Sequence, residues 1–142
     1  MTRRKLLAAL DTTRIEQAIG RAEQICAIEL RVSIAGPFWG DPEKLARAAF
    51  GRLGMTATRG RNGLLVFLAP WRRKVVIFAD QGITSQVGAD LWSGAIATIA
   101  AAFREGQFTD GLVRALEGLG RALAPHFPPA PRPNELPDHV DR

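Results

Sequence analysis

The stretch NGLLVFLAPWRRKVVIFADQGI, residues 62–83, contains the strongest structural signal in this chain. Two apolar runs, residues 64–69 and 75–79, are separated by a short turn and bounded by Gly63 and Asp80. Each run is too short for a free-standing helix and too uniformly apolar for an exposed strand. The stretch therefore predicts a buried β-hairpin with a carboxylate where its second strand ends.

The residues before this hairpin predict a strand followed by a helix. Apolar and polar residues alternate over residues 28–34, which is typical of a strand with one buried and one wetter face, less central than the hairpin. Asp41 and Pro42 are typical of a helix start, and Gly54 ends that helix. Because a strand, a helix and a second strand usually form a right-handed parallel crossover, we predict a mixed sheet in which the hairpin adds its last strand antiparallel.

Three further helices complete the expected fold. One begins near residues 11–13, where Thr13 and Glu16 form a capping box, one covers residues 87–103, and the last starts at Thr109. Helices would then cover both faces of the sheet. The predicted fold class is α/β, a three-layer α/β/α sandwich with a small mixed sheet and about four main helices.

Length and composition set the organisation of the chain. The 142 residues, 46% of them hydrophobic, are enough for one domain, which we place at residues 1–128, followed by a Pro-rich tail at residues 129–142. No apolar run has the length of a signal peptide or a membrane span, which favours a cytoplasmic location. The single Cys26 is expected to be a core side chain without a redox function.

Charge and motifs narrow the choice of partner and cofactor. The formal net charge of +5 favours an acidic partner. Nucleic acid is not the expected partner, because the sequence has no zinc-finger, helix-turn-helix or aromatic-interleaved basic pattern. We expect no nucleotide or redox cofactor, since there is no Walker loop or dinucleotide fingerprint, and we recognise no catalytic constellation.

The predicted topology brings polar residues to one edge of the sheet, where the hairpin ends and the other two strands start. Asp80 should neighbour Glu29 and the turn that contains Arg61 and Asn62. Two carboxylates beside a Gly-containing turn suit Ca²⁺ or Mg²⁺, with Arg61 and Asn62 as charge-balancing or substrate-binding groups. The same residues equally suit a salt bridge between Asp80 and Arg61, or Asp80 as the N-cap of a short helical turn at residues 83–86.

Two tryptophans are expected at the opposite edge of the sheet. Trp39 lies between Gly and Pro residues, and Trp71 is in the hairpin turn beside Arg72 and Arg73. Tryptophan among basic residues can bind a protein partner or a membrane surface through amphipathic contacts. The alternative is that each indole folds back over the exposed end of the core.

Several ordered motifs resemble the TPM domain family, from roughly the first helix to Pro128. They are NGLLVF at residues 62–67, DQGI at 80–83, VG at 87–88, Trp92, FREGQFTDGL at 103–112, Gly120 and HFP at 126–128, with ELRV at 29–32. The family takes in thylakoid-lumen repair proteins, a nematode receptor modulator and many bacterial proteins of unknown role. The resemblance implies an α/β/α sandwich, a divalent metal at the acidic edge and the phosphatase label that some plant members carry. Many relatives also have a signal peptide, a membrane anchor or a low-complexity tail, none of which this sequence shows.

Two hypotheses from different classes follow. The first is a non-enzymatic protein-interaction, assembly or repair module whose edge loops, basic surface and Pro-rich tail contact another protein, including one at a membrane. The second is a metal-dependent phosphatase acting on phosphomonoesters, in which Glu29 and Asp80 hold a cation and Arg61 offsets charge in the transition state.

Overall fold

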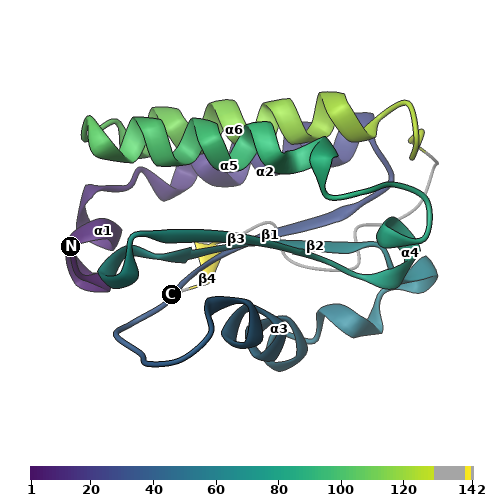
Figure 1. Ribbon diagram of the computed structural model, residues 1–142. Coiled ribbons are helices and arrows are strands. Elements are labelled where there is room, and N and C mark those ends of the chain that lie inside the picture. Colours follow the sequence, from purple (N-terminus) through teal and green to yellow (C-terminus); the bar gives the residue numbers. More distant parts are fainter. Residues whose placement is uncertain (130–139, 142) are drawn as a thin grey trace.

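A mixed β-sheet lies between two layers of helices (Figure 1). The computed structural model describes residues 1–129, 140 and 141. The order of strands across the sheet is β3-β2-β1-β4, with β1 parallel to both β2 and β4, and β2 antiparallel to β3. The strands are β1 (Glu29–Ile34), β2 (Gly63–Ala69), β3 (Lys74–Ala79) and β4 (Val140–Asp141). The predicted parallel crossover and antiparallel hairpin are therefore confirmed.

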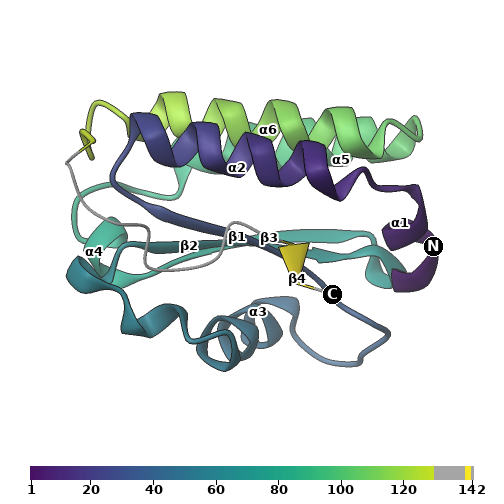
Figure 2. The ribbon, with the colours of Figure 1, turned by 180° about the vertical axis from the view of Figure 1, so that it is seen from behind.

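The helices form unequal layers on the two faces of the sheet. One face is covered by α2 (Thr12–Ile25), α5 (Asp90–Arg104) and α6 (Phe108–Leu123), and the other by α3 (Pro42–Arg52) (Figures 1 and 2). The shorter elements are α1 (Arg3–Ala9), α4 (Gln81–Thr84) and the 3₁₀ turns η1 (Met55–Ala57), η2 (Arg59–Arg61) and η3 (Pro70–Arg72). The predicted three-layer sandwich with four main helices is confirmed.

The alternation of side chains along β2 divides the core in two. Leu64, Val66 and Leu68 pack toward α2, α5 and α6 in the larger hydrophobic cluster, whereas Leu65 and Phe67 pack toward α3 in the smaller one. Every residue of β2 is buried, because helices cover both faces and strands flank both edges. The central strand therefore carries side chains of both clusters.

Two predictions about the strands are wrong. Every residue of β1 is buried, whereas no residue of β3 is fully buried. The reason is the order of the strands: β4 lies beside β1, while β3 is at an edge of the sheet. An apolar strand sequence indicates burial of side chains but does not tell whether a second neighbouring strand is present.

The N-terminal residues and the start of α2 also differ from the prediction. α1 was not expected, and the N-cap of α2 is Asp11, whose side chain accepts a hydrogen bond from the Arg14 backbone N–H at 3.2 Å. Thr13 lies inside the helix, so the predicted capping box is not the N-cap. Asp41 does cap α3, and Gly54 follows that helix with a left-handed φ of 73°, as predicted.

Of the tail predicted at residues 129–142, residues 130–139 and 142 lie outside the described part. Val140 and Asp141 pair in parallel with Val32 and Ser33 of β1. Within the described residues, no helix combines the length and the apolar character needed to cross a membrane.

Candidate functional site

The predicted acidic edge lies where β1 and β2 begin and β3 ends. One row of residues across these three strands forms it. Glu29 is in register with Gly63, and the Asp80 backbone N–H donates to the Gly63 carbonyl at 2.9 Å. Glu29 begins β1, Gly63 begins β2, and Asp80 directly follows β3. The structure therefore brings Glu29 and Asp80 to the same edge of the sheet, one strand apart.

Asp80 uses both carboxylate oxygens in contacts within the chain. Arg61 Nε donates to Oδ2 at 2.6 Å, and Arg61 Nη2 donates to Oδ1 at 2.9 Å. Oδ1 also accepts the Gln81 backbone N–H at 2.8 Å, which makes Asp80 the N-cap of α4. The hydrogen bonds from Arg61 raise the pKa of its guanidinium further above the ordinary arginine value, although Arg61 itself is partly exposed. Both structural alternatives for Asp80, the salt bridge and the cap, are therefore present together.

A close backbone approach holds this pair in place. Gly60 and Arg61 have positive φ angles of 71° and 52°. A Cβ atom added to Gly82 would lie 1.9 Å from the Gly60 carbonyl oxygen, so only glycine allows α4 to approach the turn this closely. We call Asp80, Arg61, Gly60 and Gly82 the Asp80 cluster. The sequence predicted the end of a strand at Asp80 and a helical turn at residues 83–86, two residues later than α4, but not the glycine contact.

Phe50 and Ala27 contact the middle of this row of residues. A Cβ atom on Gly63 would lie 2.9 Å from Phe50 Cζ, so the Phe50 ring lies against Gly63, the residue of β2 between Glu29 and Asp80. Asn62 is buried and its Nδ2 donates to the Ala27 carbonyl at 2.9 Å. In the described residues no group of three His, Cys, Asp or Glu side chains gathers here or elsewhere. Asp80 is engaged in an ion pair with Arg61 in this structure, and the metal assignment of Glu29 and Asp80 stays a prediction.

The opposite edge of the sheet carries two exposed tryptophans. Trp39 and Trp71 pack edge to face with their ring centroids 5.2 Å apart, and they are 83% and 40% exposed. Arg72 joins their loops, since its guanidinium lies 5.2 Å from the centroid of the Phe38 ring and donates to the Gly40 carbonyl at 2.9 Å. The indoles therefore contact each other instead of folding back over the core.

Two neighbours of the tryptophans complete this edge. Phe38 packs against the smaller hydrophobic cluster and covers this end of the core. Arg73 is exposed and has a positive φ of 52°. We call Trp39, Trp71, Arg72 and Arg73 the aromatic surface. The sequence located its residues, but their exposure depends on Phe38, whose role sequence reasoning did not identify.

Comparisons with known proteins agree on the fold. Residues 2–122 match the family model of the TPM domain. The NMR structure of the BA42 protein from the psychrophilic bacterium Bizionia argentinensis is similar with a TM-score of 0.84 and 33% identity, over 92% of this chain and 90% of that chain. No protein in a search of the curated proteins matches this chain.

Two more distant structures share the fold alone. The N-terminal domain of the cg2496 protein from Corynebacterium glutamicum has a TM-score of 0.60 and 22% identity, covering 78% of this chain and 69% of that chain. The N-terminal domain of a protein from P. gingivalis has a TM-score of 0.56 and 24% identity, covering 78% and 72%.

Proposed function

This chain belongs to the TPM domain family, and we propose that it serves as a protein-interaction module whose binding surface is the aromatic surface. The observation that carries this proposal is the exposed Trp39–Trp71 pair. Tryptophan and arginine are the residue types that most often dominate binding energy at protein interfaces. Each indole has only two side-chain torsions, so the pair presents a large contact area at little cost in conformational entropy.

The charge around the tryptophans indicates the chemistry of the partner. Arg72, Arg73 and Lys74 follow Trp71 directly, and none of them has an acidic partner within the described part of the chain. We therefore infer that the partner presents an acidic segment with an apolar side chain that contacts the indoles. The net charge of +5 acts in the same direction by attracting acidic surfaces over longer distances.

Backbone strain at Arg73 gives independent support. A non-glycine residue with positive φ costs about 1 kcal/mol relative to glycine, and glycine would be the default at such a turn. Arg73 adopts this conformation while its side chain is exposed in the turn beside Trp71. Among the described residues its side chain makes no hydrogen bond or ion pair that would offset this cost, and strained residues are found at functional sites.

Site-specific photo-crosslinking in the cells that produce this chain tests the proposal. A photoreactive phenylalanine derivative replaces Trp71 in one variant and Gln24, an exposed residue at the far end of α2, in the other. We expect one discrete protein adduct from position 71, none from position 24, and loss of the adduct when Arg72 and Arg73 are changed to Glu. Identical adducts from both positions, or no adduct from position 71, would refute the aromatic surface as the binding site.

One observation favours the second hypothesis, a metal-dependent phosphatase. Glu29 and Asp80 occupy one row of the sheet, so their Cα atoms are about 10 Å apart, within reach of a shared cation if Asp80 releases Arg61 and the Phe50 ring moves away from Gly63. Thermal unfolding with and without Ca²⁺ and Mg²⁺, alongside a phosphomonoester assay, separates the hypotheses. Metal stabilisation and turnover that both disappear in Asp80→Ala, with the fold intact, would favour the enzyme. A melting temperature that neither Ca²⁺ nor Mg²⁺ changes would leave Asp80 in its structural role.

A further inference from the structure

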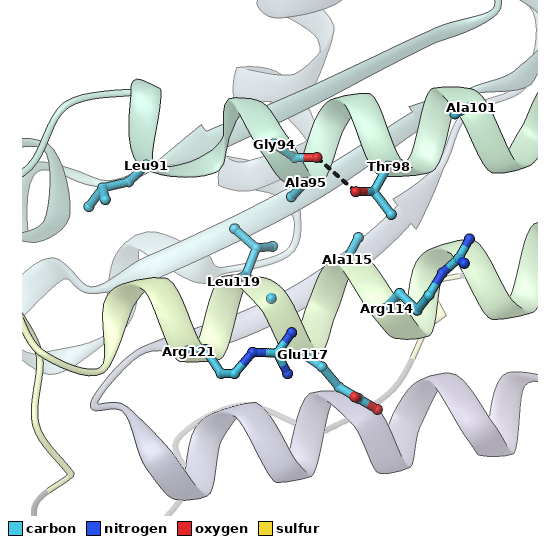
Figure 3. Close-up of a pocket in the computed structure, with 11 residues that line it drawn as sticks. Leu91, Gly94, Ala95, Thr98, Ala101, Arg114, Ala115, Glu117, Leu119 and Arg121 are labelled. Carbon is cyan, nitrogen blue, oxygen red and sulfur yellow. Dashed lines mark hydrogen bonds between the residues drawn. The ribbon is translucent and has the colours of Figure 1, made fainter.

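A groove of about 640 Å³ runs between α5 and α6 on the outer side of the helical layer (Figure 3). Four of the five residues that line the groove on α5 are small, namely Gly94, Ala95, Thr98 and Ala101, and the fifth is Leu91. Between Asp90 and Arg104, α5 contains no charged residue, although several of these positions face solvent. A surface helix normally carries charged or polar residues on its solvent face, so this face resembles one that another element covers.

Charge along α6 complements this apolar groove. Arg114 and Arg121 are exposed, line the groove, and have no partner among the described residues. They lie seven residues, or about 10 Å, apart along one side of the helix. Glu117 lies between them, but its carboxylate is paired with Arg21 of α2 at 3.0 Å. The groove therefore combines an apolar floor with two available positive charges.

We propose that the α5–α6 groove binds an acidic amphipathic helix of a partner protein. The residues that line it on α5 extend from Leu91 to Ala101, about 15 Å of helix, which accommodates roughly three turns of a bound helix. Small side chains allow a second helix to approach closely, as in other helix-in-groove complexes. Acidic residues seven positions apart on the bound helix would match the spacing of Arg114 and Arg121. A flat bilayer would meet the ridges of the helices and leave this concave floor uncovered.

Gly94 offers a substitution that blocks the groove without disturbing the fold. A Cβ atom added to Gly94 would meet nothing within 4 Å. In Gly94→Leu the new side chain extends into the groove, and replacing glycine within a helix does not weaken the helix. Gly51 of α3 is a matched control, because it is also exposed and helical, and its Cβ would likewise meet nothing within 4 Å. Gly51→Leu changes the other helical layer and leaves the groove intact.

The test measures the fluorescence anisotropy of a labelled synthetic helix of about 18 residues, with an Ala/Leu stripe and Glu at two positions seven apart. A second peptide carries Lys at those two positions. We expect the wild type and Gly51→Leu to bind the acidic peptide equally, Gly94→Leu to bind it at least about tenfold more weakly, and the Lys peptide to bind about fivefold more weakly. The variant with Arg114→Glu and Arg121→Glu should instead prefer the Lys peptide.

Three results would overturn the proposal. They are no binding of the acidic peptide, equal binding by Gly94→Leu, and no preference between the two peptides. Vesicles of anionic phospholipid are tested in parallel with the two peptides. Vesicle binding that Gly94→Leu weakens, in the absence of peptide binding, would identify a membrane as the occupant and reject the helix. The aromatic surface takes no part in this test, so its outcome is independent of the proposed function.

Discussion

Gly82 is the residue whose substitution should most directly break the Asp80 cluster. In Gly82→Ala the Cβ atom would overlap the Gly60 carbonyl oxygen at 1.9 Å, so the turn must move and the contact between Arg61 and Asp80 is lost. We expect a loss of about 3 kcal/mol in the free energy of unfolding, measured by urea denaturation. Gly51→Ala, at an open helical position, is the control and should be neutral or slightly stabilising. If Gly82→Ala left the free energy of unfolding unchanged, the close contact between Gly82 and the Gly60 carbonyl would not be required for stability.

Cys26 should make the free energy of unfolding depend on pH above about pH 9, where an ordinary thiol ionises. Burial, together with the nearby negative charge of Glu23, raises the pKa of the Cys26 thiol from 9.0 to about 12. The unfolded chain then loses this proton first as the pH rises, so folding stability falls by about 1.4 kcal/mol per pH unit between pH 9 and 12. Because the unfolded thiol is already about half ionised at pH 9, we expect the wild type to lose about 1 kcal/mol more stability than Cys26→Ala between pH 9 and 10. A parallel loss in both proteins would contradict the raised pKa.

Single residues show why the candidate site could be predicted only in part. The Asp80 cap and the salt bridge to Arg61 follow from short-range geometry. Asp80 directly follows β3, Arg61 precedes β2, and the two strands pair antiparallel, which brings the two residues together. The exposure of Trp39 and Trp71 could not be predicted, since it depends on which of the neighbouring aromatic residues covers the core. Phe38 does so, and no local pattern distinguishes its role from that of Trp39.

The edge strand β3 should be recognisable by hydrogen exchange. Because the Asp80 N–H bonds to Gly63 and hydrogen-bonded pairs alternate in an antiparallel ladder, the amides of Val76 and Phe78 point toward β2. The amides of Val75 and Ile77 then point to the open edge. We expect fast exchange at Val75 and Ile77 and slow exchange at Val76 and Phe78, measured by NMR. Equal protection of all four would show that a further strand covers this edge in solution.

Elements with strong local patterns were predicted well, and elements held by distant contacts were not. The N-cap and proline of α3, the glycine after it and the apolar runs of β2 and β3 all have local signals, and each element lies where the sequence placed it. β4 has two residues and pairs with β1 through backbone groups, which leave no side-chain pattern. The α5–α6 groove likewise depends on how the two helices pack against each other. The pattern within either helix does not predict that packing.

The α/β/α arrangement separates the two proposed binding surfaces. The groove lies on the outer side of the layer that contains α5 and α6, whereas Trp39 lies in the loop between β1 and α3, across the sheet (Figure 1). Substitutions at distant sites without shared partners usually have additive effects. In the variant with Trp39→Ser and Trp71→Ser, we therefore expect the affinity of the groove for the acidic peptide to stay within about twofold of the wild type. Fluorescence anisotropy of the wild type, this variant, Gly94→Leu and the combined variant completes a thermodynamic cycle. A change of about tenfold or more on removing the tryptophans would show that the sheet transmits coupling between its two sides, and the surfaces would then act as one regulated unit.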